Sequence, residues 1–203
     1  MLDFSNSKIL IVGDVMLDKY YFGKVDRISP EAPVPIVNIQ KEESRLGGAS
    51  NVANNIVSLG GHSLLCGVIG HDLFGKEIER ISRHKNIDTF LLKTSSPTIT
   101  KARIIGGKQQ IVRVDYEDKS ELNADNKKLF RDTISRILPE YDILVISDYG
   151  KGLISEDLCR YLIKLAHKYD KKVIIDPKGK NWEKYSGADI VTPNVKELSD
   201  IVG

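Results

Sequence analysis

The stretch Ile9-Leu10-Ile11-Val12 is apolar at every position, and two later stretches, Ile143-Leu144-Val145-Ile146 and Val173-Ile174-Ile175, repeat the pattern. A strand with one face in water alternates apolar and polar residues, so uninterrupted β-branched runs indicate strands buried on both faces. Such strands belong to parallel sheets that helices cover on each side. We therefore predict an α/β protein with a mainly parallel central sheet.

Five segments fit strands of this sheet, because each is short, apolar and bounded by turn residues. They are residues 8–13, 63–69, 142–147, 172–176 and 189–192. Helical periodicity lies between them. Phe130, Ile134, Ile137 and Leu138 share one helix face, and Leu158, Leu162, Leu165 and Tyr169 share another. Ser155 precedes the second pattern as a favourable N-cap, so both segments are predicted to be surface helices.

Two segments break this alternation and are predicted to be β structure outside the central sheet. Residues 30–35 hold three of the seven prolines, and proline cannot donate a hydrogen bond within a sheet, so this segment is an edge or a flap. Residues 98–115 form two extended runs about Gly106-Gly107-Lys108, which is typical of a β-hairpin. Together they predict a small β lid that comprises residues 27–40 and 97–116.

The composition of the chain indicates which class of partner the protein binds and in which cellular compartment it works. The 203 residues carry 30 Lys and Arg against 28 Asp and Glu, a balance that favours a small molecule over nucleic acid or a membrane surface. Cys66 and Cys159 lie far apart in the sequence and are interpreted as buried thiols of a reduced, cytoplasmic protein. The apolar run 9–12 is too short for a signal peptide or a membrane span. The four histidines show no metal-ligand spacing.

Polar residues follow the predicted strands, where ligands collect in open α/β sheets. These residues are Asp14, Asp18, Asp148, Lys151, Asp176, Lys178, Asn194 and Glu197. Structural roles explain several of them equally well: Asp14 and Asp18 suit turns, and Asn194 with Glu197 three residues later resembles a capping box. Arg103 and Arg113 of the hairpin are equally compatible with solvated charges.

The stretch Gly47-Gly48-Ala49-Ser50-Asn51 precedes an apolar helical pattern formed by Val52, Ile56 and Leu59. Glycines at such a junction let a ligand approach the backbone and the helix N-terminus. A tight turn with Ser50 or Asn51 as the helix cap explains the stretch almost as well. The spacing matches neither a dinucleotide fingerprint nor a P-loop.

Residues 47–53, followed by Gly60 and Gly70, resemble the N-terminal signature of the PfkB, ribokinase-like sugar kinases. Within that family, residues 27–35, 100–115 and 147–152 resemble the kinases that act on heptose 7-phosphate. The resemblance covers essentially the whole chain and implies a ribokinase-like three-layer sandwich with a β lid, or clasp. It also implies ATP with Mg²⁺, and phosphorylation of D-glycero-β-D-manno-heptose 7-phosphate at its anomeric hydroxyl for ADP-heptose and lipopolysaccharide core.

The resemblance further implies which residues bind the sugar phosphate. Asp18, with Asp14 as the weaker candidate, matches the aspartate that binds sugar hydroxyls. Arginine and lysine give phosphate charge-assisted hydrogen bonds, which makes cations of the lid and the strand ends candidates for the phosphate pocket. The other substrate-binding residues implied are Gly47, Gly48, Asn51, Arg113, Asp148 and Lys151.

On the nucleotide side, Asn194 and Glu197 match the family's Asn-x-x-Glu, in which Glu197 would order Mg²⁺ through water and Lys178 would add a phosphate contact. The family's second signature, Gly-Ala-Gly-Asp, does not occur in the 203 residues. In the family, the Asp of this signature is the catalytic base, and the backbone N–H groups of the signature stabilise the transferring phosphoryl group. Positioning and electrostatic stabilisation of this kind are what phosphoryl transfer most needs.

The family's catalytic base is therefore expected to lie beyond Gly203, the last residue of the sequence. We expect residues 1–203 to be an incomplete kinase domain, truncated on its C-terminal side and inactive alone, with no catalytic base of its own.

Two other functions are compatible with the sequence. One is a PfkB kinase for a different sugar, such as fructose 1-phosphate or ribose. The other is a non-catalytic remnant that binds a sugar phosphate or dimerises. Because an exposed strand edge is usually covered, the lid also predicts a homodimer formed through it.

Overall fold

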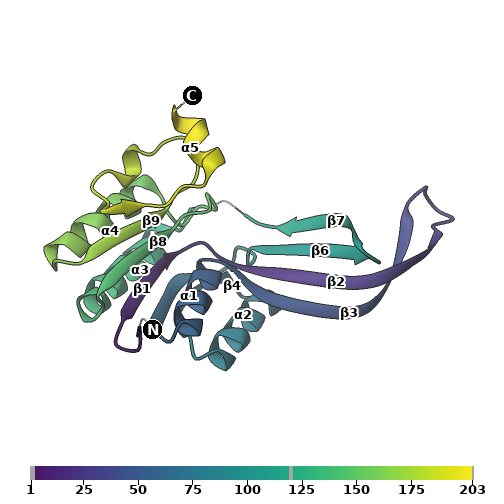
Figure 1. The fold of residues 1–203 in the computed structure, drawn as a ribbon, viewed down its shortest axis with the longest axis horizontal. Coiled ribbons are helices and arrows are strands. Elements are labelled where there is room, and N and C mark those ends of the chain that lie inside the picture. Colours follow the sequence, from purple (N-terminus) through teal and green to yellow (C-terminus); the bar gives the residue numbers. More distant parts are fainter. Residues whose placement is uncertain (1–2, 119–120, 203) are drawn as a thin grey trace.

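The computed structural model describes residues 3–118 and 121–202, which form a body and a projecting lid (Figure 1). The body contains a six-stranded sheet in the order β10-β9-β8-β1-β4-β5, with every neighbouring pair parallel. Its strands are β1 (Lys8–Gly13), β4 (His62–Gly70), β5 (Asp88–Thr94), β8 (Ile143–Ser147), β9 (Lys172–Asp176) and β10 (Ile190–Val191). The predicted parallel sheet is confirmed. The prediction omitted β5, an edge strand whose mixed sequence lacks a continuous β-branched run.

The central strand β1 explains why its sequence is apolar without interruption. Leu10 pairs with Leu64 of β4 on one side and Leu144 of β8 on the other. Leu10 and Val12 belong to one buried cluster, whereas Ile11 belongs to a second cluster on the opposite face. Both faces of the sheet are therefore covered, as the sequence predicts.

Helices form the outer two layers of the body (Figure 1). The helices α1 (Ala49–Ser58) and α2 (Leu73–His84) pack on one face, and α3 (Ala124–Ile137) and α4 (Glu156–Lys168) pack on the other. The predicted cap of α4 is present, since Ser155 Oγ accepts a hydrogen bond from Leu158 N at 3.3 Å. Short 3-10 turns, η1 (Leu138–Glu140) and η2 (Glu183–Tyr185), and the helix α5 (Val195–Val202) complete the elements.

The lid is a separate four-stranded sheet in the order β3-β2-β6-β7. Its strands are β2 (Val15–Ile28), β3 (Pro35–Gly48), β6 (Thr100–Gly106) and β7 (Gln109–Tyr116). The predicted hairpin of 98–115 is present as β6 and β7. The first lid segment is longer than predicted, because β2 begins two residues after β1 ends. Asp18 consequently lies inside a lid strand rather than at the end of β1. The prediction of β structure over residues 30–35 is wrong for residues 30–34, which lie in the loop between β2 and β3, since the three prolines of 30–35 disfavour strand pairing.

The catalytic base was expected beyond Gly203, and the described structure ends just before that residue. The last described element is α5, which ends at Val202, and Gly203 lies outside the described residues. The expectation that the base lies beyond Gly203 therefore stays a prediction.

Two further expectations concern burial and membranes. Cys66 and Cys159 are free, buried thiols, and burial raises the pKa of Cys159 to about 12. Within the described ranges 3–118 and 121–202, no helix has the length and apolar character needed to cross a bilayer.

Candidate functional site

The lid joins the body through the predicted glycine turn. Gly48 is the N-cap of α1 and has φ +54°, and Ala49 N donates a hydrogen bond to the carbonyl of Asp14 at 3.0 Å. A Cβ on Gly48 would lie 2.4 Å from that carbonyl oxygen, so glycine is required here. No side chain caps α1, and Ser50 Oγ instead donates backwards to the carbonyl of Gly47 at 2.6 Å. The glycine turn therefore leaves the start of α1 open to a ligand.

A cavity of about 610 Å³ lies at this junction, between the lid and the start of α1. It brings together four of the predicted sugar-binding residues: Asp18, Gly47, Gly48 and Asn51. Its remaining polar lining includes Arg45, Asn54, Lys85, Lys101, Arg103 and Tyr149. Sequence segments far apart in the chain thus converge on one chamber.

One carboxylate, Asp18, and four cationic side chains, Arg45, Lys85, Lys101 and Arg103, line this cavity. The parallel pairing of β2 and β6 sets Asp18 beside Lys101, and Asp18 Oδ1 accepts a hydrogen bond from Arg103 at 2.6 Å. Burial and nearby cations lower the pKa of Lys101, and the charge of Asp18 opposes that effect. Arg45 and Arg103 both lie against the ring of Tyr20, 5.0 and 5.2 Å from its centroid. The cavity therefore has the charge to receive an anionic group.

Sequence reasoning missed Arg45 and Lys101, and it left Arg103 undecided between the site and a solvated charge. Lys101 and Arg103 are two residues apart, so they share one face of β6. That spacing was a usable signal, but the partner strand that brings Asp18 to this face could not be seen in the sequence.

Asp14 lies outside this cavity and holds the loop that follows β8. It is 2% exposed, and its Oδ2 accepts hydrogen bonds from Tyr149 N at 2.8 Å and Lys151 N at 3.1 Å. Burial raises the pKa of the Asp14 carboxyl, although these backbone donors oppose the shift. Lys151 forms an ion pair with Glu117 and lines a neighbouring cavity of about 200 Å³ together with Asp14.

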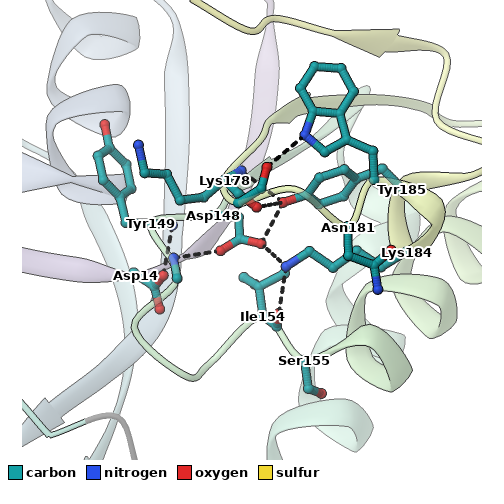
Figure 2. A network of polar contacts seen from close by, with 12 residues as sticks. Asp14, Asp148, Tyr149, Ile154, Ser155, Lys178, Asn181, Lys184 and Tyr185 are labelled. Carbon is teal, nitrogen blue, oxygen red and sulfur yellow. Dashed lines mark hydrogen bonds and ion pairs between the residues drawn. The ribbon is translucent and has the colours of Figure 1, made fainter. Parts of the chain in front are cut away.

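Asp148 and Arg113 also lie outside the lining of the larger cavity. Asp148 is 2% exposed and contacts Tyr185, Lys184 and its own loop (Figure 2). Arg113 is half-exposed on β7 and forms a two-pronged ion pair with Asp115 at 2.8 and 2.9 Å. Asp14, Lys151, Asp148 and Arg113 are therefore not part of the lining of the cavity that holds Asp18, although the charges of Lys151 and Arg113 act on Lys101 within it.

The nucleotide-side candidates are close together. Asn194 Oδ1 accepts from Glu197 N at 2.9 Å, and Glu197 Oε2 accepts from Asn194 N at 3.0 Å, which is the reciprocal capping box of α5. Lys178 Nζ donates to the other oxygen, Glu197 Oε1, at 2.9 Å. Burial acts to raise the pKa of Glu197, but the bonds from Lys178 and Asn194 outweigh it and the pKa is lowered.

The donor set near Glu197 fits Mg²⁺ only indirectly. Both carboxylate oxygens already accept hydrogen bonds, and the described part of the chain contains no group of three or more His, Cys, Asp or Glu arranged to hold a metal. Mg²⁺ commonly keeps several waters and takes one or two carboxylates together with substrate phosphates. A water-mediated contact is thus the role that Glu197 can offer.

Comparison with known proteins identifies relatives of the whole chain. The profile described as pfkB family carbohydrate kinase matches residues 6–203. The bifunctional protein HldE of Helicobacter pylori (strain P12) is 48% identical over 193 residues, which is 94% of this chain and 42% of that protein. The D-beta-D-heptose 7-phosphate kinase of Bordetella bronchiseptica is 44% identical over 200 residues, 98% of this chain and 63% of that protein. The chain thus spans less than two thirds of the length of these relatives.

Solved structures with the same fold include phosphofructokinase-2 from Escherichia coli in its tetrameric inhibited form. That structure has a TM-score of 0.75 and 21% identity, covering 97% of this chain and 64% of the other. A carbohydrate kinase from Agrobacterium tumefaciens has a TM-score of 0.73 and 18% identity, with 97% and 64% covered. At these identities the likeness establishes the fold, which is the ribokinase-like sandwich that the sequence predicts.

Proposed function

Because the chain belongs to the pfkB family of carbohydrate kinases, we propose that it is the sugar-binding part of a kinase for D-glycero-β-D-manno-heptose 7-phosphate. The reaction would transfer the γ-phosphoryl group of ATP to the anomeric hydroxyl, giving the 1,7-bisphosphate for ADP-heptose and lipopolysaccharide core in the cytoplasm. The observation that carries this proposal is the cavity in which Asp18 faces Lys101, Arg103 and Arg45.

The neutral end of the substrate fits the glycine side of the cavity. The carboxylate of Asp18 can accept hydrogen bonds from sugar hydroxyls, and the amide of Asn51 can both donate and accept. Gly47 and Gly48 present no side chains, so a sugar ring can approach the backbone at the start of α1. These groups favour a polyhydroxylated ligand.

The anionic end fits the lid side of the same cavity. Arg45, Lys101 and Arg103 supply cations on one lid face, and charge-assisted hydrogen bonds to phosphate are stronger than neutral ones. Arg103 also donates to Asp18, so the hydroxyl-binding and phosphate-binding groups are contiguous. A phosphorylated sugar engages both halves. An unphosphorylated sugar brings no anion to the cationic half, where Arg103 pairs with Asp18 and Arg45 pairs with Glu43. Roles for Arg113, Lys151 and Asp14 in direct substrate contact stay predictions.

We further propose that Lys178, Asn194 and Glu197 mark the side where ATP and Mg²⁺ bind. Bound Mg²⁺ neutralises charge on the nucleotide phosphates. Lys178 would contact a phosphate oxygen, and Glu197 would accept hydrogen bonds from water around the ion. Their mutual contacts at 2.9 Å hold these side chains together at the start of α5.

The polypeptide of residues 1–203 is proposed to bind the sugar phosphate without turning it over, because no Gly-Ala-Gly-Asp run occurs in it. Calorimetry should detect binding of heptose 7-phosphate, with weaker binding of ribose and fructose 1-phosphate. A coupled ATPase assay with heptose 7-phosphate should detect no turnover. Turnover on the order of 10 s⁻¹, which is ordinary for enzymes, would refute the inactivity of this polypeptide. Tighter binding of another sugar would instead favour a different kinase of the family.

We also propose that the lid forms a homodimer. In the pairing of β6 with β7, Arg103 lies beside Arg113, so Val112 and Val114 point to the opposite face, away from Asp18. Both valines are at least 40% exposed, as are Val25 of β2 and Ile39 of β3 in the same sheet. An exposed apolar face on a sheet with open edges favours burial against a second copy.

A further inference from the structure

The loop after β8 separates the sugar cavity from the nucleotide-side residues. The ring of Tyr149 lines the cavity, and Lys101 Nζ lies 5.9 Å from its centroid. On the other side, the side chain of Lys178 passes over Gly150, 3.6 Å from the position that a Cβ would take. Burial raises the pKa of Tyr149, and the charges of Asp176 and Glu197 add to the shift. Tyr149 therefore stands at the boundary between the two halves of the site.

A buried carboxylate fixes the conformation of this loop. Asp148 Oδ1 accepts a hydrogen bond from Gly150 N at 2.7 Å. Its Oδ2 accepts from the hydroxyl of Tyr185 at 2.7 Å and forms an ion pair with Lys184 (Figure 2). Asp148 is 2% exposed and the Lys184 side chain is 15% exposed, so water does little to weaken the pair.

The groups that hold Asp148 belong to a different part of the chain. Lys184 and Tyr185 lie in η2. Tyr185 is 3% exposed, and its ring packs edge-to-face with that of Trp182, with the ring centroids 6.5 Å apart. The Tyr185 hydroxyl also accepts from Lys178 N at 2.9 Å. One aromatic side chain thus connects the backbone that carries Lys178 with the carboxylate that shapes the Tyr149 loop.

The loop is held from its other side by Asp14, which accepts hydrogen bonds from Tyr149 N and Lys151 N. Two buried carboxylates therefore fix consecutive amides of one short loop, Asp14 from the end of β1 and Asp148 from within the loop. If one partner is removed, the remaining buried charge is unpaired, which is strongly unfavourable. The loop must then move to satisfy that charge, so its backbone is held closely only while every partner is present.

We propose that Asp148 is a positioning residue for the sugar site: held by Lys184 and Tyr185, it sets the loop so that the Tyr149 ring closes the cavity facing Asp18 and Lys101. Asp148 acts through Tyr149 and not by touching the sugar. The choice of heptose 7-phosphate as the ligand for the test rests on the proposed function. The described loop geometry is independent of that function.

Calorimetric titration with heptose 7-phosphate tests the proposal on the full chain. D148N and K184M are expected to weaken binding by about tenfold or more, and K184R, which keeps the cation, by no more than about threefold. Y149L should weaken binding to a similar extent, because it removes the ring that closes the cavity. The double variant D148N/Y149L should bind no more weakly than Y149L alone, because coupled residues are not additive.

Folding is separated from positioning by two further variants. D148N/K184M removes both charges, which avoids an unpaired buried ion and preserves stability, yet it should still bind weakly. D189N is the matched control: Asp189 likewise accepts from a lysine, Lys172, at 2.7 Å and from a backbone amide, Val173 N, at 2.9 Å, but near the start of β9. D189N should keep the affinity of wild type.

Amide hydrogen exchange supplies a readout that needs no ligand. D148N should accelerate exchange at Tyr149 and Lys151, and D189N should leave those two amides unchanged. Folded D148N with wild-type affinity and wild-type exchange would overturn the proposal, as would K184R binding as weakly as K184M. If wild type fails to bind heptose 7-phosphate, the proposed substrate is wrong, and the exchange result alone decides the role of Asp148.

Discussion

Asp18 and Arg103 sit 85 positions apart in the chain, yet their side chains meet at 2.6 Å on the cavity face of the lid. Each is about one-fifth exposed, so the pair is already oriented before a ligand arrives. We expect D18N to weaken heptose 7-phosphate binding by about tenfold or more, through loss of a hydroxyl acceptor and release of Arg103. R103A should weaken it similarly, through loss of a phosphate donor.

Arg113 provides the control for that prediction. It is an arginine of the same lid face, but it pairs with Asp115 outside the cavity lining. R113A should weaken binding less than R103A does, because Arg113 lies outside the cavity lining and already pairs with Asp115. An equal loss for R113A and R103A, measured by calorimetry, would place the phosphate further out on the lid.

The buried carboxyl of Asp14 makes a prediction about pH. Burial raises its pKa in the folded protein above the value near 3.9 of an unfolded chain, so the folded state holds the proton more tightly. Its contribution to stability is therefore complete below pH ~4 and is lost as the pH rises through the folded pKa. Urea unfolding of wild type and D14N from pH 4 to 7 should show wild type losing stability relative to D14N. Parallel curves would contradict this.

The local geometry of single residues was predictable where one short segment of sequence carries the whole signal. The Gly47 to Asn51 turn and the capping pair of Asn194 and Glu197 are local in sequence, and the structure places both as the spacing predicts. Arg45 and Lys101 acquire their position only through cross-strand pairing, so their place in the cavity was out of reach. Asp148 was predicted to touch substrate, and its burial against Lys184 and Tyr185 depends on a segment 36 residues or more away.

At the scale of elements, continuous apolar runs were the most reliable signal. Strands β1, β8 and β9 are buried on both faces and have no polar alternation to obscure the pattern. The lid strands β2 and β3 have one face against the cavity and one in solvent, and they mix charged with aromatic residues. Apolar periodicity does not predict these strands, because most of their residues are partly or fully exposed and need not be apolar.

The junction between β3 and α1 yields a prediction about a backbone conformation. G48A places a Cβ 2.4 Å from the carbonyl oxygen of Asp14 and forces alanine to φ +54°. We expect a loss of unfolding free energy well above the ~1 kcal/mol that a left-handed alanine alone costs. Thermal and urea denaturation measure it.

Gly60 is the matched control for G48A. It also has positive φ, at +91°, but nothing lies within 4 Å of a Cβ built there. G60A should therefore show the conformational cost without the clash, about 1 kcal/mol. Equal destabilisation by G48A and G60A would contradict the expected clash, because it would mean that the carbonyl of Asp14 moves away from the new Cβ at no cost.

At the scale of the whole molecule, the lid extends away from the body (Figure 1). The lid strands also carry exposed apolar side chains, Val25, Ile39, Val112 and Val114. We expect wild type to sediment as a dimer at tens of micromolar, and V114E to sediment as a monomer because it introduces charges into the apolar contact. L59E is the control, since Leu59 is 65% exposed at the end of α1, away from the lid strands. A monomeric wild type in analytical ultracentrifugation would remove the dimer proposal.

The parallel pairing of β2 with β6 also dictates an order of folding. Between these strands the chain completes β3, α1, β4, α2 and β5, so Asp18 cannot meet Lys101 and Arg103 until that whole stretch has been laid down. Closing so long a loop is favourable only after the intervening elements have collapsed. The lid face that carries Asp18 therefore forms only after β6 has been made, about halfway along the 203 residues. A nascent chain released earlier would lack both β6 and β7, the edge strand that pairs with it.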